Sequence, residues 1–305
     1  MIELNVIDEV SRLRAVILGR ADENGPIPSL EDTYDPKSAK NIRQGTYPII
    51  EDMVQEIEAV NQIFKKYNVK VYRPELIKDY NQIFTRDIAF VIEDKLIIGN
   101  ILEDRSKEID AIQYIIDQIK PENVIRFPAE AHIEGGDVMP WRDYIFVGTY
   151  KDKNYRKYIT ARTNMKAVES LQELFPDKKV MSFSLRKSNS VPIENALHLD
   201  CCFQPIGKGK AIIHRNSFLI EEEYQWLITY FGPENIFEIT DEEMTSMFSN
   251  IVSISENVIL SEQNFTRLNN WLRENDFIVE EVPYAEISKQ SGLLRCSTLP
   301  LFRDK

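Results

Sequence analysis

Hydrophobic and polar positions along the chain follow a layout that recurs about five times, with a short apolar strand or hairpin, an amphipathic helix and a further apolar strand in each unit. In the first unit, RLRAVILGR predicts a strand, apolar residues spaced by three and four predict a helix after Tyr47 and Pro48, and VKVYRP predicts the next strand. The units share this layout rather than a literal sequence. The pattern therefore predicts an α/β fold made of similar repeats.

The four later units keep the same order of elements. They begin at FTRDIAFVIEDKLIIGNI, IEGGDVMPWRDYIFVGT, ALHLDCCFQPIGKGKAIIH and SNIVSISENVILS. The second unit contains a predicted helix with Ser106 as its N-cap and isoleucines at positions 109, 112, 116 and 119 on one stripe. No Pro/Gly/Ser-rich linker separates the units, so we expect residues 1–305 to form a single domain.

A polar residue stands at or just before the first hairpin strand in each of the later units. These residues are Asp87, Asp137, Asp200 and Asn250. Units arranged in a ring would direct these strand ends to one central channel, so that acidic residues far apart in the sequence could form a single site. Asp and Asn are also frequent at turns for local reasons, and the pattern alone allows either interpretation.

The composition limits the classes of function. The chain has 305 residues and a formal net charge of -12, and binding to a phosphate backbone draws its affinity from clustered Lys and Arg. Nucleic acid is therefore not an expected partner, whereas an acidic cleft is compatible with a small cationic ligand. No secretory signal and no apolar stretch of bilayer length is visible, so we expect a cytoplasmic protein without a membrane partner.

The three cysteines, Cys201, Cys202 and Cys296, form a poor disulfide framework and contain no CxxC metal spacing. This usage favours a reducing compartment. Cys201 and Cys202 lie in an apolar run and are typical of buried structural residues. Cys296 follows Arg295, and a neighbouring cation favours the nucleophilic thiolate, although a buried structural role is the alternative for any single cysteine.

His198 and Asp200 occupy alternate positions of LHLD, which reads as part of a strand, so their side chains are expected on the same face. An imidazole beside a carboxylate is suited to general acid and base chemistry. A hydrogen-bonded core histidine and a metal ligand are the alternatives. Neither His132 nor His214 is in such a paired setting, and we expect no histidine-rich metal site.

Two further segments put charged residues ahead of apolar strands. In IEGGD, Glu134 and Asp137 flank two glycines that allow a close approach of the backbone. This segment is not a phosphate loop, because the Lys-Ser/Thr that completes one is missing. In FTRD, Arg86 and Asp87 precede the strand. Each segment taken alone is equally compatible with a surface cap or an ion pair.

Taken together, FTRD, EGGD, HLD and the C-terminal Cys296 resemble, in order and type, the guanidino-group-modifying superfamily, which includes arginine deiminase, dimethylarginine dimethylaminohydrolase and glycine amidinotransferase. The opening LRAVILGRADENGPIPS also resembles amidinotransferases, so the resemblance covers nearly the whole chain. It implies a five-bladed α/β propeller of ββαβ units, the pentein fold. It also implies a small cationic guanidino compound as substrate.

The resemblance implies a role for each motif. Asp87 and Asp200 bind the guanidinium nitrogens, because carboxylates hold a planar cation through paired charge-assisted hydrogen bonds. Cys296 attacks the central carbon. His198 protonates the departing amine, and Glu134 holds His198 and keeps it charged. Thiolate, imidazole and water suffice for this chemistry, so no cofactor and no metal is expected.

The reaction and the far end of the substrate stay open in the sequence. Four arginines are candidates to meet a substrate carboxylate, namely Arg86, Arg162, Arg186 and Arg295. The covalent amidino intermediate on Cys296 could be opened by water, as in a hydrolase, or by a second amine, as in an amidinotransferase. EGGD favours a deiminase-like hydrolase of arginine or a related compound, whereas GRADENGPIP favours a transferase; we expect the hydrolase. A noncatalytic guanidino-compound binder is the alternative from another class, and a homo-oligomer is compatible with the sequence.

Overall fold

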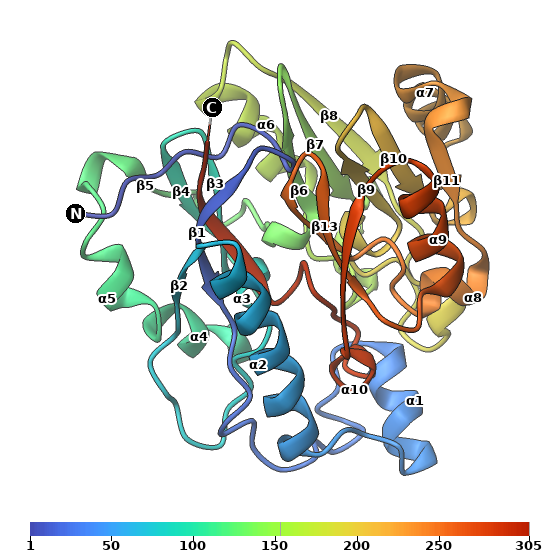
Figure 1. Cartoon of the computed structure of the whole chain (residues 1–305). Coiled ribbons are helices and arrows are strands. Elements are labelled where there is room, and N and C mark those ends of the chain that lie inside the picture. Colours follow the sequence, from blue (N-terminus) through green and yellow to red (C-terminus); the bar gives the residue numbers. More distant parts are fainter. Residues whose placement is uncertain (153, 305) are drawn as a thin grey trace.

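The computed structural model describes residues 1–152 and 154–304 and contains five three-stranded sheets (Figure 1). The central strand of each sheet pairs antiparallel with one neighbour and parallel with the other. In four sheets the antiparallel pair is a hairpin of consecutive strands, and the parallel strand follows after helical segments. These units are the predicted ββαβ repeats and form the blades of the α/β propeller.

The strands group into sheets in the order of the chain. They are β1 (Leu13–Leu18), β2 (Lys70–Tyr72) and β15 (Thr298–Arg303); β3 (Ala89–Ile92), β4 (Lys95–Ile98) and β5 (Val124–Arg126); β6 (Val138–Trp141), β7 (Tyr144–Thr149) and β8 (Lys179–Ser184); β9 (Phe203–Ile206), β10 (Lys210–Ile213) and β11 (Ile236–Glu238); and β12 (Val252–Ser255), β13 (Val258–Glu262) and β14 (Ile278–Val282).

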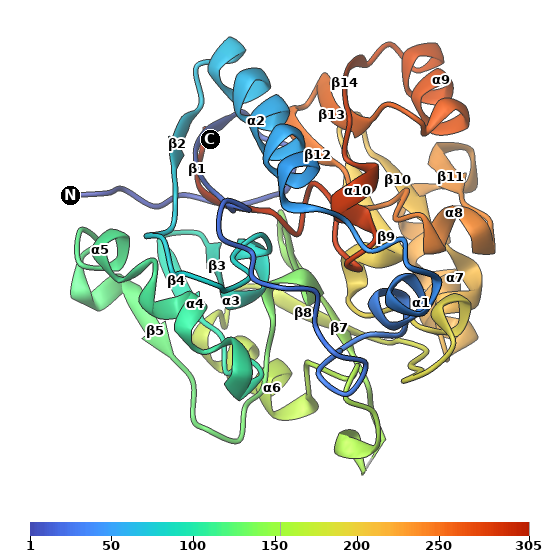
Figure 2. The same ribbon diagram turned by 90° about the horizontal axis from the view of Figure 1, so that it is seen from below.

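The helices lie mainly at the periphery, outside the sheets (Figures 1 and 2). They are α1 (Pro36–Gln44), α2 (Ile50–Lys66), α3 (Thr85–Ile88), α4 (Lys107–Asp110), α5 (Gln113–Ile116), α6 (Met165–Leu174), α7 (Glu221–Phe231), α8 (Asp241–Thr245), α9 (Thr266–Glu274) and α10 (Ala285–Ser288). Helix α2 buries the predicted stripe of Met53, Ile57, Val60 and Phe64. Apolar side chains thus fill the space between the helices and the blades.

The first sheet joins the two ends of the described chain. Strand β1 pairs antiparallel with β15 and parallel with β2, and Ile17 lies opposite Leu299. The sequence pattern did not predict β15, because its partner stands almost three hundred positions earlier and no turn signal connects them. Residues just before β15, including Cys296, are therefore held by the ring closure.

The expected helix of the second unit is divided into α4 and α5. Of the predicted stripe, Ile112, Ile116 and Ile119 are buried and Ile109 is half-buried, but β-branched residues restrict side-chain rotamers and lower helix propensity. Ser106 does stand at the N-cap position of α4, yet its side chain makes no capping hydrogen bond. The predicted position of the N-cap is confirmed, but the predicted capping hydrogen bond is wrong.

Short helical turns lead into the hairpins at the positions that the repeat pattern singles out. Asp87 lies in α3, Asp137 in the 3-10 turn Gly135–Asp137 and Asp200 in the 3-10 turn Leu199–Cys201. The prediction that His198 and Asp200 share one face of a strand is therefore wrong. The His198 carbonyl accepts a hydrogen bond from the Cys201 amide, which closes the turn before β9 begins.

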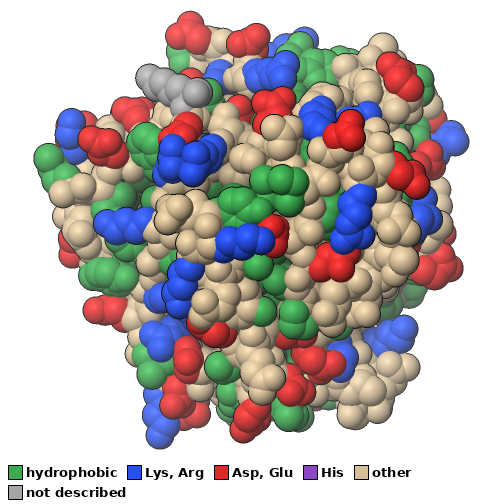
Figure 3. Space-filling view, in the orientation of Figure 1, with side chains coloured by type: hydrophobic (Ala, Val, Ile, Leu, Met, Phe, Trp, Pro, Cys, Tyr) green, Lys and Arg blue, Asp and Glu red, His purple; other side chains and the backbone are tan. Residues whose placement is uncertain are grey.

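Two properties of the whole molecule bear on its partners. Acidic and basic side chains are intermixed over the face in Figure 3, without a continuous basic patch on that face. Within the described ranges, no helix combines the length and the apolar character that crossing a membrane demands.

Candidate active site

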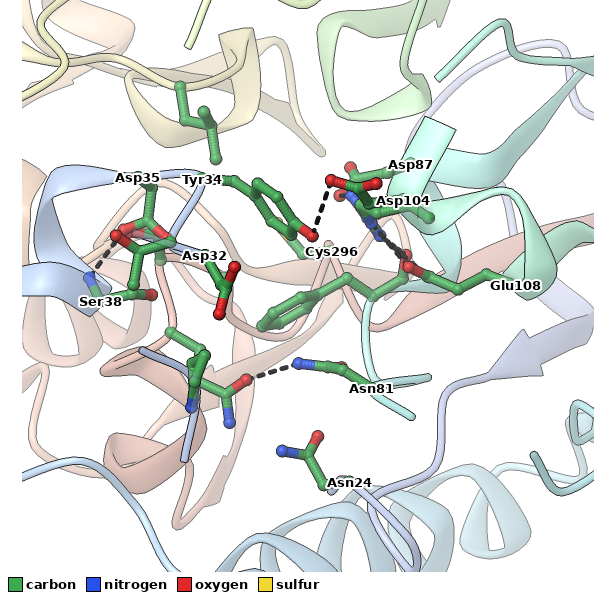
Figure 4. A pocket seen from close by; sticks show the side chains of 18 of the residues that line it. Asn24, Asp32, Tyr34, Asp35, Ser38, Asn81, Asp87, Asp104, Glu108 and Cys296 are labelled. Carbon is green, nitrogen blue, oxygen red and sulfur yellow. Dashed lines mark hydrogen bonds and ion pairs between the residues drawn. The ribbon is translucent and has the colours of Figure 1, made fainter. Parts of the chain in front are cut away.

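Asp87, His198 and Cys296 line one cavity of about 290 Å³, although they come from three different blades (Figure 4). The N-terminal segment before and within α1 forms another part of the wall, where Tyr34 donates a hydrogen bond to Asp104 over 3.3 Å. Other lining residues include Asn81, Phe84, Arg105, Glu108, Arg162 and Gly292. The cavity thus brings a thiol, an imidazole and carboxylates together in its wall.

His198 is held by a buried carboxylate. Its Nε2 lies 2.7 Å from Glu134 Oε2, and its Nδ1 lies 3.6 Å from Asp87 Oδ1. Burial disfavours the charged imidazolium, but Asp87 and the hydrogen bond to Glu134 outweigh it and raise the pKa of His198 to about 9. The imidazole is therefore protonated at neutral pH and is ready to act as an acid.

Glu134 keeps its charge although it is fully buried. Arg162 Nη1 lies 3.1 Å from Oε1 and 3.2 Å from Oε2 of this carboxylate. Burial favours the neutral acid, but Arg162, His198 and Arg105 outweigh it, so the pKa of Glu134 is lowered below its ordinary value. Glu134 and His198 consequently form a charged pair.

The glycines of EGGD make room for this pair. A Cβ atom on Gly136 would lie 2.7 Å from His198 Nδ1 and 3.0 Å from Asp87 Oδ1, which is too close for any side chain. The close backbone approach predicted from the two glycines is therefore confirmed at Gly136. Its partner is the imidazole itself.

Asp87 is oriented by Arg105, whose Nη1 lies 2.9 Å from Asp87 Oδ2, while Glu108 binds the other side of the same guanidinium. The second oxygen, Asp87 Oδ1, and His198 Nδ1 are buried and have no hydrogen-bond partner among the residues that the structure describes. Buried polar atoms without a partner are costly. Both belong to residues of the cavity wall, and a bound ligand could satisfy them.

Cys296 Sγ lies 3.2 Å from Asn250 Nδ2 and 3.7 Å from Asp200 Oδ2. Burial, Asp200 and Asp87 raise the pKa of the Cys296 thiol well above its ordinary value. The thiol is therefore protonated at neutral pH as long as no positive charge enters between the two carboxylates.

Arg295 and Arg86 do not line the cavity. Arg295 Nη1 lies 2.9 Å from Asp200 Oδ2, and its Nε and Nη2 each lie 3.1 Å from the Glu9 carboxylate. Arg86 is buried, and its Nε donates to the Arg295 carbonyl. The geometry does not support the prediction that these two arginines meet the substrate, because carboxylates and carbonyls of the interior hold them.

Arg105 and Arg162 are the arginines of the cavity wall in the described part of the chain. Arg162 was one of four candidates, whereas nothing in the sequence pattern indicated Arg105, which stands 18 positions after the aspartate that it binds. Asn250 stood out only as a strand-start residue. The fourth candidate, Arg186, is exposed and donates to the Asn216 carbonyl.

Asp87, Glu134 and His198 also offer three ligand atoms within 4.8 Å of one another, a set that could hold a metal ion. Arg105 and Arg162 bind oxygens of both carboxylates in the structure. A divalent cation would have to compete with these guanidinium groups for the same oxygens. The donor set is therefore better suited to acid and base chemistry than to a metal centre.

Comparisons with known proteins identify the family of the chain. The profile of the family described as N,N dimethylarginine dimethylhydrolase, eukaryotic, matches residues 31–303. Three relatives can be compared along most of the chain. The Bacillus subtilis protein described as uncharacterized protein YkgA is 28% identical over 73% of this chain and 70% of the relative. The dimethylarginine dimethylaminohydrolase of Pseudomonas aeruginosa is 26% identical over 65% of this chain and 67% of the relative. An arginine deiminase of Bacillus thuringiensis is 26% identical over 83% of this chain and 72% of the relative.

Solved structures show the same fold. The N-terminal domain of ArgZ, an arginine dihydrolase from the ornithine-ammonia cycle in cyanobacteria, has a TM-score of 0.77 at 18% identity, over 95% of this chain and 97% of that domain. SxtG, an amidinotransferase from Microseira wollei, has a TM-score of 0.77 at 16% identity, over 99% and 98%. With its family profile, its five blades and its four motifs, the chain belongs to the N,N dimethylarginine dimethylhydrolase family of the guanidino-group-modifying superfamily.

Proposed function

We propose that the chain is a cysteine-dependent, arginine deiminase-like hydrolase that acts on arginine or a related guanidino compound through a covalent intermediate on Cys296. The main support is that Cys296, His198 and Asp87 line one cavity, while the fully buried Glu134 binds His198 and the fully buried Asp200 lies beside Cys296. Relatives named as dimethylarginine dimethylaminohydrolase and arginine deiminase support the same reaction class.

The substrate guanidinium binds between Asp87 and Asp200. Asp87 Oδ1 accepts from one guanidinium nitrogen, which satisfies an oxygen that otherwise has no partner among the described residues. Asp200 Oδ2 lies 3.7 Å from Cys296 Sγ, so a nitrogen held there brings the guanidinium carbon close to sulfur. The incoming cation also offsets both carboxylates that raise the pKa of Cys296, so substrate binding promotes loss of the thiol proton to solvent.

The thiolate attacks the guanidinium carbon and forms the carbon–sulfur bond. His198 gives its proton to the departing nitrogen, the carbon–nitrogen bond breaks, and the amine leaves. The proton comes from Nδ1, because Nε2 is bound to Glu134. Neutral His198 then takes a proton from water, whose oxygen attacks the same carbon. The carbon–sulfur bond then breaks and the proton of the new hydroxyl group is lost to solvent, which releases a neutral ureido product and regenerates the thiolate.

We assign the far end of the substrate to Arg105 and Arg162 in place of Arg86 and Arg295. Both line the cavity, and a guanidinium can bind a carboxylate through paired hydrogen bonds. Their existing contacts with Asp87, Glu108 and Glu134 fix their orientation. This arrangement favours a substrate that retains an amino-acid carboxylate.

A substrate panel tests the proposal. Arginine, monomethylarginine and dimethylarginine are incubated with the protein, with and without glycine or ornithine as acceptor, and ureido product, ammonia and released methylamines are measured. We expect ureido product without an acceptor, and a covalent adduct on Cys296 by intact mass and peptide mapping. Cys296→Ser should abolish turnover while Cys201→Ser retains it.

Each contrary result has a definite meaning. Turnover that persists in Cys296→Ser would rule out the mechanism with Cys296 as the nucleophile. Product that forms only with an acceptor amine would identify an amidinotransferase. Tight binding without product or adduct would identify a noncatalytic binder.

A further inference from the structure

Asn250 contacts the proposed nucleophile and is fully buried. Its Oδ1 accepts hydrogen bonds from the backbone amides of Arg295, at 2.9 Å, and Cys296, at 3.1 Å. Its Nδ2 lies 3.2 Å from Cys296 Sγ and 3.4 Å from the Asp200 carbonyl. Three of these contacts join the fifth blade to the segment that bears the thiol, and the fourth joins it to the turn that contains Asp200.

These contacts fix which end of the amide faces sulfur. The Arg295 and Cys296 amides can only donate, so they require the carbonyl oxygen of Asn250. The Asp200 carbonyl can only accept, so it requires the NH2 group. The reverse orientation would set donor against donor and acceptor against acceptor. Asn250 therefore offers an N–H group to sulfur.

A donor at this place matters because two charged groups near sulfur, Asp200 and Asp87, are anionic. Burial and these two carboxylates raise the pKa of Cys296, whereas hydrogen bonds with the backbone of Leu293 and from the side chain of Asn250 lower it. The repeat sharpens this contrast. Three blades have aspartate at the turn before the hairpin, and the fifth blade has the neutral asparagine where the side chain meets the thiol. A fourth carboxylate there would repel the thiolate.

We propose that the Asn250 side-chain amide is the hydrogen-bond donor that stabilises the Cys296 thiolate, in the free protein and during attack on the substrate. This rests on the proposed function only in taking Cys296 as the nucleophile. Asn250 contacts the reacting sulfur and is a catalytic residue in that sense, beyond holding the backbone of the Cys296 segment.

The test measures thiol reactivity rather than turnover. The full chain is treated with iodoacetamide at several pH values between 7 and 9, and the alkylation rate at Cys296 is followed by peptide mapping, which separates it from Cys201 and Cys202. The variants are Asn250→Ala, which loses donor and acceptor, and Asn250→Asp, which keeps the acceptor oxygen for the two backbone amides. Asn269→Asp, another fully buried asparagine with side-chain and backbone partners, is the matched control.

Loss of the donor should raise the thiol pKa by about one unit in Asn250→Ala, which leaves about tenfold less thiolate. A thiolate becomes about threefold more nucleophilic for each unit by which its pKa rises. This gain offsets part of the tenfold loss of thiolate, so the alkylation rate should fall only about threefold. Asn250→Asp adds a negative charge and should slow alkylation about tenfold or more. Asn269→Asp should alkylate like the wild type, whatever stability it loses.

The alkylation rate of Asn250→Ala decides the question, because this variant loses the N–H group without adding a charge. If the N–H group of Asn250 does not stabilise the thiolate, Cys296 in Asn250→Ala will be alkylated at the wild-type rate at every pH, which overturns the proposal. Failure of the proposed function is seen separately in the substrate panel, as persistent turnover in Cys296→Ser or as no ureido product from the wild type, whatever the alkylation rates of the Asn250 variants.

Discussion

His198 and Glu134 depend on each other's charge. Removing the charge while keeping the shape, as in Glu134→Gln, takes away a main group that raises the pKa of His198 from 6.5 to about 9. We expect the alkaline limb of the pH profile of kcat to move to lower pH and kcat at neutral pH to fall by about a hundredfold. Glu262→Gln, a buried carboxylate bound to Asn264, serves as the control.

The same pKa shift predicts how stability changes with pH. A group with a raised pKa in the folded state stabilises it fully below the unfolded pKa, and this contribution is lost as pH rises through the folded pKa. The free energy of unfolding should therefore decline between pH 6.5 and about 9, by on the order of 3 kcal/mol. Denaturant titrations across this range should show a flatter decline in His198→Asn; an equal slope in both proteins would contradict the pKa.

Arg295 is expected to affect folding rather than substrate binding. Arg295→Met leaves Glu9 and Asp200 buried without their partner, which should lower the free energy of unfolding by about 3–5 kcal/mol. Arg186→Met, at an exposed position, should change it by about 0.5 kcal/mol or less. A stable Arg295→Met protein with a raised KM would instead restore the role predicted from the sequence.

Sequence order alone could not give the direction of these arginine side chains. Arg295 and Arg86 stand beside Cys296 and Asp87, yet both face interior carboxylates and carbonyls. Arg105 and Asn250 stand in no motif, and long-range packing brings them to the site. The motifs contain three residues of the cavity wall, Asp87, His198 and Cys296, but the orientation of their side chains depends on partners from other blades.

Among the secondary-structure elements, hairpins and the α2 stripe were predictable because local periodicity and turn residues determine them. Strand β15 was not, since its partner β1 lies at the other end of the described chain. The turn at Leu199–Cys201 was mistaken for a strand, because an apolar run has the same composition in both conformations. Its closure depends on the amide of Leu199, which donates to Asp137 of the preceding blade.

Strand β15 should contribute strongly to stability. Leu299 is fully buried opposite Ile17, so Leu299→Ala should lower the free energy of unfolding by about 2–5 kcal/mol. Ile278→Ala in β14 removes an isoleucine that is 55% exposed and should cost about 1 kcal/mol or less. Chemical denaturation of both variants provides the comparison, and equal losses would contradict the importance of the closing strand.

At the scale of the whole molecule, we propose that residues 1–305 act as one catalytic domain. The tryptophans lie in the third, fourth and fifth units, at Trp141, Trp226 and Trp271, whereas far-UV circular dichroism reports on all the blades. One cooperative unit predicts coincident unfolding curves by tryptophan fluorescence and circular dichroism. Two separated transitions would show that the blades unfold as independent parts.

The pairing of β15 with β1 also determines when, during synthesis of the chain, the proposed activity can first appear. Protein synthesis delivers strand β1 before the other strands of the five sheets, and the Cys296 segment and β15 after them. A growing chain still attached to the ribosome can assemble the strands of four blades while its first blade lacks one strand and its proposed nucleophile is not yet in position. The proposed nucleophile is thus added together with the strand that completes the ring, so we expect chains that stop before Cys296 to lack the proposed reaction with guanidino compounds.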